Sequence, residues 1–541
     1  MTRRHPERSE GPPRRERPFA ALRVTTPILA VAAILRLWNL SDVPPGLNVD
    51  EAANGWNAFC LARTLHDQHG VFLPILDSAG YGQGLSTLLL YVMAPFVGVL
   101  GPTTFAIRLP GVIAGVATVW LVYFIGKELF DRRVGLAAAA MLAISPWHLQ
   151  LSRWGHMATL FPFLVALVIL LMLRTDSWKR ALIAGAVAGL ALYGYYAIRL
   201  WLPLFLIGTV FIWWKKRREL AAFIAAMFVV AAPLAYGTLF NPLLQKRAQL
   251  TWVWDASDSF ATRAAKVAAR YPPHFGLDFL FRRGDIDPTD APPSGHGYFF
   301  WFMLPLFIAG AIYVFRKSKF LGAFVLLYPA ADLFNRHPSA HSLRGAPGVI
   351  ALTLLAAAGL IALIDLKRLR IPIAIVLAVW ASIEIVRFVP DYFSEFRTNP
   401  RRYDAYTADL HEALRWLAPR VSQYDAVLIT ATNTSHPYIR TLLELRYPPR
   451  QWFADPKVFR AGPLPDGTYR DEQYCVSFGK FHYLFGGDTL DVIANLQRNG
   501  KPDRVLMILR PGELGALAGT PVRRIYNPAG DETMWICEGS M

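Results

Sequence analysis

The sequence predicts an α-helical polytopic membrane protein, with about eleven membrane-crossing helices and one soluble α/β domain at its C-terminal end. Of the 541 residues, 54% are hydrophobic and only 18% are charged. The apolar residues fall in blocks of about 16 to 20 instead of alternating with polar ones, which is the pattern of helices that span a bilayer. After about residue 390 the composition shifts towards that of a soluble protein.

The formal net charge of +17 does not indicate nucleic-acid binding, because the basic residues sit in short clusters between the apolar blocks. Loops rich in Lys and Arg remain on the cytoplasmic side of a membrane. The clusters that we assign to cytoplasmic loops are Lys127/Arg132/Arg133, Arg174/Lys179/Arg180, Lys215 to Arg218, Arg316/Lys317/Lys319 and Lys367/Arg368/Arg370. These loops fix the orientation of every helix between them.

Residues 1–24 are rich in Arg, Pro and Glu and are expected to form a disordered cytoplasmic tail. The first apolar block, 25–38, follows without a small-residue cleavage site and is therefore expected to be a retained anchor. The next block, 105–126, ends on the basic cluster at Lys127 and must return to the cytoplasm. Residues 40–104 then form one external loop.

An apolar piece inside that loop, 84–100, would break the alternation of sides if it crossed, and it contains Pro95 and Gly98. It is expected to be an interfacial or re-entrant helix. The remaining crossings are expected at 134–150, 157–173, 181–197, 199–214, 220–236, 298–315, 320–335, 346–364 and 371–389. A second external loop, 237–297, is polar and proline-rich.

The transmembrane domain therefore covers 25–389, and residues 390–541 lie outside the cytoplasm. In this second domain we predict buried strands at 426–430 and 505–509 and an amphipathic helix at 406–417, hence an α/β fold. The sequence contains no internal repeats, which weakens an inverted-repeat transporter interpretation.

Three cysteines, Cys60, Cys475 and Cys537, are too few for a disulfide framework. Cys475 and Cys537 would share an oxidising compartment, so a bond between them stays open.

Asp50 and Glu51 begin a helix-compatible run just beyond the first membrane helix. Two interpretations remain open. In one, Asp50 caps the helix and Glu51 complements its dipole. In the other, an ionised carboxylate held at the water–lipid boundary acts as a general base towards a substrate hydroxyl or amine.

Several short motifs follow one another along the sequence, and their order is informative. They are Asn48-Val49-Asp50-Glu51, Ile107-Arg108-Leu109-Pro110 with Gly111 and Gly115, Asp131-Arg132-Arg133-Val134-Gly135, and Ile144-Ser145-Pro146-Trp147-His148 with Ser152-Arg153. Together they resemble the GT-C glycosyltransferases, and within these the bacterial protein mannosyltransferase and aminoarabinose transferase group, which is glycosyltransferase family 39-like. The resemblance covers about residues 25–365.

The resemblance implies the GT-C fold and an enzyme of the cytoplasmic membrane that transfers a sugar, usually with inversion, from a polyprenyl-phosphate donor to a protein, lipid or glycan acceptor on the outer face. The family's first-loop acid maps onto Asp50 as the base, and Glu51 then supports the helix dipole or the substrate site. The short external loop 151–159 departs from many members because it holds no acid. We therefore expect a metal-independent displacement, with no metal site and no cofactor.

His156 in that loop is a candidate for binding a sugar hydroxyl or the phosphate, although a lone histidine at an interface is often only hydrogen-bonded. A departing phosphate requires cations, because charge builds on it as the glycosidic bond breaks. The arginines expected near the outer leaflet are Arg36, Arg108, Arg153, Arg199 and Arg344. Each could instead extend to lipid phosphates.

Residues 335–345 form a short external loop in which His341 and Arg344 are the best phosphate-binding pair; the alternative is an ordinary polar turn. Tyr196, next to Arg199 in a cluster of tyrosines, either stacks on a sugar or belongs to an interfacial aromatic belt. No glycine-rich nucleotide-phosphate loop occurs, which disfavours nucleotide-sugar or ATP chemistry.

The sequence thus predicts a polyprenyl-phosphate-dependent glycosyltransferase. Two other classes remain open. A transporter or flippase of lipid-linked sugars would use the same cations but needs no base. A structural assembly protein would act through its C-terminal domain.

Overall fold

The structure is a computed structural model, and it describes residues 18–75, 78–80, 83–213, 215–240, 252–337, 339–463, 469–486, 492–494, 496, 502–515 and 519–539. Most of the expected disordered tail, 1–17, lies outside the described residues, as do 241–251 of the second external loop. Residues 18–24, expected in the tail, instead belong to the first helix.

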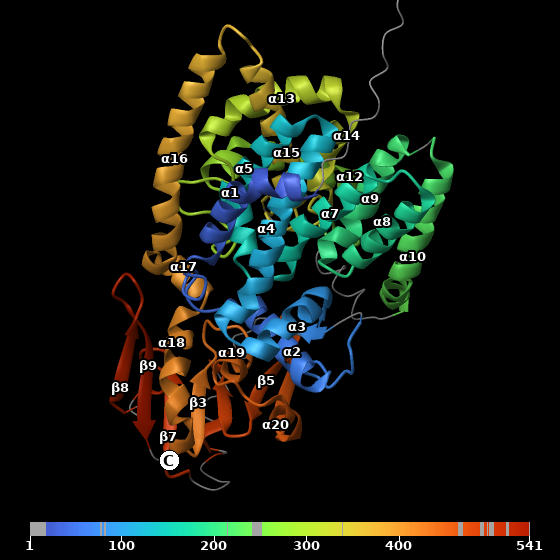
Figure 1. Cartoon of the computed structure of the whole chain (residues 1–541). Coiled ribbons are helices and arrows are strands. Elements are labelled where there is room, and N and C mark those ends of the chain that lie inside the picture. Colours follow the sequence, from blue (N-terminus) through green and yellow to red (C-terminus); the bar gives the residue numbers. More distant parts are fainter. Residues whose placement is uncertain are drawn as a thin grey trace, which may run out of the picture.

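A bundle of helices forms the larger part of the protein (Figure 1). Its members are α1 (Pro18–Leu37), α4 (Thr104–Leu129), α5 (Arg132–Ile144), α6 (Pro146–Ser152), α7 (Phe161–Leu173), α8 (Trp178–Ala191), α9 (Tyr196–Thr209), α10 (Arg217–Phe240), α13 (Leu304–Lys317), α14 (Lys319–Leu327), α15 (Pro347–Ile364) and α16 (Arg370–Thr398). A helix thus occupies the place of each expected crossing.

Among the described residues, α4, α10, α15 and α16 are each long and apolar enough to cross a membrane alone. The expected crossing 134–150 is broken, because α5 and α6 meet at an angle of 62°. Ser145 accepts a hydrogen bond from the backbone N–H of His148 and so starts α6 as a separate helix. The total of about eleven crossings stays a prediction.

The glycines of the sequence motifs are points of close helix packing. A Cβ on Gly115 of α4 would lie 2.4 Å from the Cβ of Ser152 at the end of α6. A Cβ on Gly126 would lie 2.8 Å from the Cα of Gly135 on α5. Small residues let helix backbones approach within a membrane, so these motifs are explained by packing of the bundle.

The first external loop contains α2 (Val49–Thr64), the hairpin β1 (Ser78–Gly80) and β2 (Gln83–Leu85), and α3 (Leu88–Leu100). Figure 1 shows α2 and α3 between the helical bundle and the C-terminal sheet. At Gly55 of α2, a Cβ would lie 2.5 Å from Ile107 of the bundle and 3.4 Å from Leu443 of the C-terminal domain. This helix is therefore enclosed from both sides.

The second external loop contains α12 (Phe260–Ala269) and the short helices η3 (Pro272–Phe275), η4 (Asp278–Arg282) and η5 (Trp301–Met303). Its segment 285–292 is anchored by the linker after α16. Arg402 of α17 (Pro400–Ala405) donates hydrogen bonds to the carbonyls of Pro288 and Ala291 at 3.2 and 3.1 Å.

The C-terminal domain is built on a seven-stranded sheet of order β4-β5-β6-β3-β7-β9-β8. Its strands are β3 (Ala426–Thr430), β4 (Lys457–Pro463), β5 (Tyr469–Phe478), β6 (Phe481–Leu484), β7 (Val505–Leu509), β8 (Pro521–Tyr526) and β9 (Glu532–Gly539). Its helices are α18 (Ala408–Leu417), α19 (Pro437–Glu444) and α20 (Pro449–Ala454).

The central strands β3 and β7 begin and end at the predicted residues, and the predicted helix is α18. β3 pairs in parallel with β6 and β7 and is buried along its whole length. Continuous apolar strands of this kind have both faces covered. The α/β prediction for this domain is confirmed.

A disulfide between Cys475 and Cys537 does not form, and both cysteines are free and buried. Cys475 lies on β5 and Cys537 on β9, and three strands separate them in the sheet. Adjacent strands are about 4.8 Å apart, so the two thiols are far beyond bonding reach.

Candidate active site

Asp50 lies in the first turn of α2, but it does not cap the helix. The cap is Asn48, whose side-chain oxygen accepts hydrogen bonds from the backbone N–H groups of Asp50 at 2.7 Å and Glu51 at 3.3 Å. Glu51 completes a capping box by accepting a hydrogen bond from the backbone N–H of Asn48 at 3.3 Å. The Asp50 carboxylate is 33% exposed and is left for another role.

Glu51 is an internal anchor of the site. Its fully buried carboxylate receives two hydrogen bonds from Arg108, at 2.8 and 3.0 Å, and one from the backbone N–H of Gly155 at 2.9 Å. Arg108 uses its remaining N–H groups on the carbonyls of Leu40, Pro44 and Gly46. Both residues were expected at the substrate, and the structure instead assigns them to holding the first external loop on α4.

His156 faces Asp50 at the N-terminal end of α2. The Nε2 atom of His156 lies 3.5 Å from Oδ2 of Asp50. Its Nδ1 accepts a hydrogen bond from the backbone N–H of Ala158 at 3.0 Å, which places the ring proton on Nε2, towards Asp50. Stacking on Trp154, with ring centroids 4.6 Å apart, fixes the imidazole plane. The two expected site residues are therefore brought together.

Arg36 and Arg153 lie inside the protein, with 0% exposure each. Arg36 donates hydrogen bonds to the carbonyl of Ala143 at 2.9 Å and contacts Nδ1 of His148 at 2.9 Å. Arg153 donates to the carbonyls of Arg36 and Val43 at 2.7 and 2.8 Å. The NH1 and NH2 atoms of Arg36 are thus used at the end of α5, and those of Arg153 on carbonyls at and after the end of α1. These contacts hold α1 against its neighbours, and a role of either arginine at the donor phosphate stays a prediction.

Arg344 differs from the other arginines, because much of its guanidinium is unused. Its NH2 atom is 3.4 Å from the hydroxyl of Tyr196. Its Nε and NH1 atoms are buried and have no hydrogen-bond partner among the described residues. The nearest carboxylate is that of Asp332, 3.6 Å from NH1. A cation held in this way is suited to receive an anion.

A row of aromatic contacts joins Arg344 to Asp50. The ring of His156 lies edge-on to that of Tyr195, with centroids 5.8 Å apart, and the hydroxyls of Tyr195 and Tyr196 are 3.1 Å apart. Tyr196 is in turn the contact of Arg344. Arg199 lies beside this row, donating hydrogen bonds to the carbonyl of Leu192 and the hydroxyl of Ser86, both at 3.2 Å.

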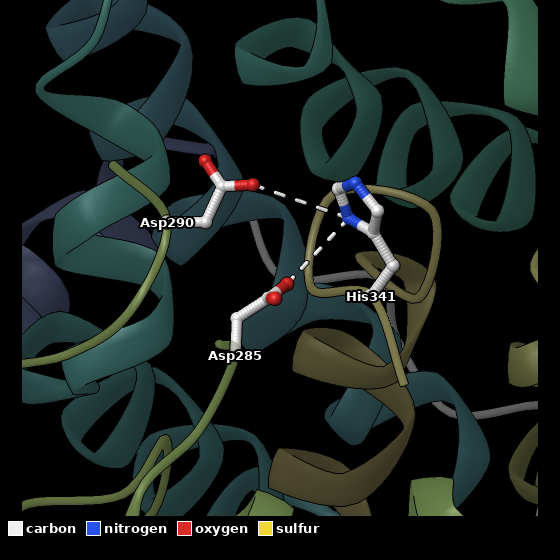
Figure 2. Close-up of side chains that lie close together, drawn as sticks. All are labelled: Asp285, Asp290 and His341. Atoms are coloured by element: carbon white, nitrogen blue, oxygen red, sulfur yellow. Dashed lines mark ion pairs between the residues drawn. The ribbon is translucent and has the colours of Figure 1, made fainter. Parts of the chain in front are cut away.

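His341 belongs to the same short loop as Arg344, and its ring faces two buried acids. Figure 2 shows the carboxylates of Asp285 and Asp290 directed at the His341 ring. The Nδ1 atom of His341 lies 3.6 Å from Oδ2 of Asp285 and 4.0 Å from Oδ2 of Asp290. The Nδ1 atom of His341 is thus directed at two acids, and a phosphate-binding pair of His341 and Arg344 stays a prediction.

The charges of this cluster depend on its burial. Burial, and then the charges of Asp287 and Asp285, raise the pKa of Asp290 well above its usual value. Burial also raises the pKa of Asp285. Burial, and then the positive charge of Arg344, lower the pKa of His341 well below its usual value, and His156 contributes in the same direction. His341 is therefore neutral at neutral pH.

The sequence predictions did not include Asp285, Asp290 or Asp332, and they included Tyr195 only as a member of the tyrosine cluster 193–196. Three of these are acids in or beside polar external loops, and that loop composition was taken as a sign of surface only. The spacing Asp285-x-Asp287-x-x-Asp290 was the available signal, because acids this frequent in a partly apolar loop suggest a charged site.

Comparison with known proteins agrees with this architecture. A family-level sequence profile described as dolichyl-phosphate-mannose-protein mannosyltransferase matches residues 86–236. No protein with a curated description matches the sequence.

Among solved structures, ArnT from Cupriavidus metallidurans bound to undecaprenyl phosphate is similar, with a TM-score of 0.55 and 13% identity over 96% of this chain and 98% of that one. The apo form of the same ArnT gives a TM-score of 0.53 at 13% identity over the same shares. The Archaeoglobus fulgidus oligosaccharyltransferase tethered to an acceptor peptide gives 0.46 at 14% identity, over 79% of this chain and 63% of that one. The fold predicted from the sequence motifs, GT-C, is confirmed.

Proposed function

We propose that this GT-C-fold protein is a glycosyltransferase that moves a sugar from a polyprenyl-phosphate donor to an acceptor at the outer face of the cytoplasmic membrane. The observation that carries the proposal is the row of contacts from Asp50 through His156, Tyr195 and Tyr196 to Arg344. It joins an accessible carboxylate to a buried cation whose Nε and NH1 atoms have no hydrogen-bond partner within the described part of the chain.

Asp50 supplies the general base. Its carboxylate is partly exposed, and the capping of α2 is performed by Asn48 and Glu51, so it is available to an acceptor hydroxyl or amine. His156 directs its Nε2–H towards Asp50 and orients the carboxylate. A positioned base of this kind contributes about 10² to 10⁴ in rate.

Arg344 receives the phosphate. The Nε and NH1 atoms of Arg344 are buried and make no hydrogen bond within the described residues, and each buried polar atom left without one costs roughly 1–3 kcal/mol. Asp332, 3.6 Å from NH1, balances part of the charge, and a phosphate oxygen would supply the missing hydrogen bonds. Tyr196 provides a hydroxyl and a ring face next to this position, suited to a phosphate oxygen or a sugar.

The reaction is a single displacement. Asp50 removes the proton of the acceptor nucleophile as it attacks the anomeric carbon. The bond from that carbon to the phosphate oxygen breaks, and its electron pair leaves with the polyprenyl phosphate, whose growing charge Arg344 stabilises. One displacement inverts the anomeric configuration.

The comparisons support the class of donor. The similar ArnT structure contains undecaprenyl phosphate, and the matching family description names a dolichyl-phosphate sugar. Both are polyprenyl-type phosphates, and the charge of such a lipid requires a cation at the site, as Arg344 provides. The basic loops of the sequence support an extracytoplasmic position for this site.

A transporter of lipid-linked sugars is the alternative that uses the same cation. Mass spectrometry of polyprenyl-phosphate lipids from cells with and without the gene tests the proposal. An enzyme predicts that a polyprenyl-phosphate sugar accumulates when the gene is removed and falls again when the wild type, but not Asp50→Asn, is restored. A transporter without a proton-coupled step predicts rescue by both.

The assembly-protein alternative cannot be tested by deleting residues 395–541, because that deletion also uncovers α2. Arg440 donates a hydrogen bond to the carbonyl of Leu47 at 3.3 Å, and Trp452 donates one to the carbonyl of Gln68 at 2.8 Å. The point substitution Asp50→Asn avoids this difficulty.

A further inference from the structure

Asp285, Asp290 and His341 present three ligand atoms that lie within 4.8 Å of one another, and all three residues are buried. Two of them come from the second external loop and the third from the loop between η6 (Tyr328–Ala331) and α15. Figure 2 shows one oxygen of each carboxylate directed at the same ring nitrogen. The three residues thus converge from separate segments on one point.

Hydrogen bonding does not explain this convergence. The backbone N–H of Leu343 points at Nδ1 of His341 at 3.2 Å, so this nitrogen carries a lone pair, which a metal ion would take over from that long hydrogen bond. The carboxylate oxygens at 3.6 and 4.0 Å are also acceptors and are beyond hydrogen-bond distance. The three ligand atoms are thus too far apart to hydrogen-bond with one another, at distances that a shared cation would bridge.

Within the described residues, no Lys or Arg side chain forms an ion pair with Asp285 or Asp290, and the His341 ring beside them is neutral. Arg344 acts on Asp290 only through its charge at longer range. Asp290 is 4% exposed, and its Oδ2 atom makes no hydrogen bond within the described part of the chain. The neighbouring Ser342 hydroxyl is likewise buried without a hydrogen-bond partner there.

We infer that Asp285, Asp290 and His341 bind one divalent metal ion of the Zn²⁺ type. Two carboxylate oxygens and one imidazole nitrogen suit Zn²⁺, whereas Ca²⁺ and Mg²⁺ prefer oxygen ligands throughout. Bonds of about 2.0–2.2 Å in a tetrahedron separate ligand atoms by roughly 3.4 Å, close to the distances found. Three protein ligands leave the fourth position for water or a phosphate oxygen.

The surrounding contacts hold both loops in place for such an ion. The backbone N–H of Ser342 donates to Oδ2 of Asp285 at 2.8 Å, and the Tyr298 hydroxyl donates to the carbonyl of Asp290 at 2.9 Å. The ion would fasten the second external loop to the segment that carries Arg344. This consequence for Arg344 rests on the proposed function, whereas the metal site does not.

The test is metal binding by the full-length protein in detergent, after EDTA treatment and desalting. Titration with Zn²⁺ alone, followed by elemental analysis, should give one ion per chain for the wild type. Asp290→Asn and His341→Gln should weaken binding by more than about 100-fold, since even residues that only support a metal ligand are worth 10- to 100-fold. Co²⁺ in place of Zn²⁺ should give the visible absorption of a tetrahedral site.

Two controls lie in the same external loop and outside the cluster. Asp278→Asn removes an exposed acid that pairs with Arg283, and His296→Gln removes a histidine that contacts Asp391. Both should bind Zn²⁺ like the wild type. A wild type that takes up neither Zn²⁺ nor Mn²⁺, or cluster variants that bind as tightly as the controls, would overturn the inference. If a cluster variant fails to fold, the Co²⁺ spectrum of the wild type alone tests the site, and the absence of the tetrahedral absorption would overturn the inference.

The outcome is separable from that of the proposed function, because metal content is measured without a sugar donor. A protein that binds Zn²⁺ at this site and transfers no sugar would contradict the proposed function alone.

Discussion

The imidazole Nε2 of His156 lies 3.5 Å from Oδ2 of Asp50, and one buried carboxylate fixes the backbone beside both residues. Glu51 is the neighbour of Asp50 in the chain, and it accepts a hydrogen bond from the N–H of Gly155, the neighbour of His156. The distance between the proposed base and its partner is therefore set by Glu51 and Arg108. This division between an accessible acid and a buried one leads to the first two predictions.

Asp50→Asn should lower turnover by at least about 100-fold while folding and donor binding are retained, because an amide cannot accept the acceptor's proton. Turnover is measured with purified protein and a polyprenyl-phosphate sugar. The matched control is Asp42→Asn, an exposed acid at the start of the same loop. Near-native turnover of Asp50→Asn would remove this residue from catalysis.

Glu51→Gln should destabilise the protein by about 3–5 kcal/mol, because it leaves the buried Arg108 without its counter-charge. Thermal unfolding in detergent measures the effect. Glu128→Gln breaks the half-exposed ion pair with Arg174, 2.9 Å long, and should cost no more than about 1 kcal/mol. Equal losses of stability in the two variants would show that the buried Glu51–Arg108 pair contributes no more to stability than a half-exposed ion pair.

Arg344→Ala should weaken binding or turnover of the donor by about 1.5–3 kcal/mol, the value of a hydrogen bond to a charged group. Arg344→Lys should restore only part of the loss, since it keeps the charge and lacks the planar fork. Arg336→Ala, at an exposed arginine that pairs with Asp255 in solvent, serves as control. Equal donor affinities across all four proteins would exclude Arg344 from the site.

Trp452→Ala should cost about 3–5 kcal/mol, because this 1% exposed side chain joins the C-terminal domain to the first loop. Its ring lies 6.3 Å from that of Trp56, and its Nε1–H bonds to Gln68. Trp416→Ala on α18, whose ring faces Arg420, should cost clearly less. Unfolding curves of both variants decide, and a smaller loss for Trp452 than for Trp416 would contradict this role.

The basic loops predict that a reporter active only outside the cytoplasm works after Met541, and that one active only in the cytoplasm works after Arg218. Fusions at both positions are compared in whole cells. Cytoplasmic reporter activity at Met541 would invert the proposed orientation of the site.

Elements with strong local patterns could be predicted from the sequence. The strands β3 and β7 match their predicted bounds, because each contains a short, continuous run of apolar residues, Ala-Val-Leu-Ile in β3 and Val-Leu-Met-Ile-Leu in β7. The break between α5 and α6 was missed, although Ser145-Pro146 is a helix-start signal, because the apolar pattern continues across it.

The roles of the arginines could not be predicted in this way. Arg108, Arg153 and Arg344 all follow apolar segments at similar depth, and only the folded backbone distinguishes them. Carbonyls of residues 35–46 turn inwards and take up the first two, whereas the third meets Tyr196. Carbonyl direction is a property of loop conformation, and hydropathy carries no information about it.

The enclosure of α2 has a consequence for how such proteins can be recombined. A Cβ at Gly55 would lie 2.5 Å from Ile107, which would have to move, and 3.4 Å from Leu443, which is in ordinary contact, so α2 packs closely against the bundle and touches the C-terminal domain. A chimera that joins this helical bundle to a foreign C-terminal domain would need to exchange the first external loop as well. The part that can be transplanted is thus discontinuous in the gene. The first external loop and the C-terminal domain lie far apart in the sequence and would have to be exchanged together.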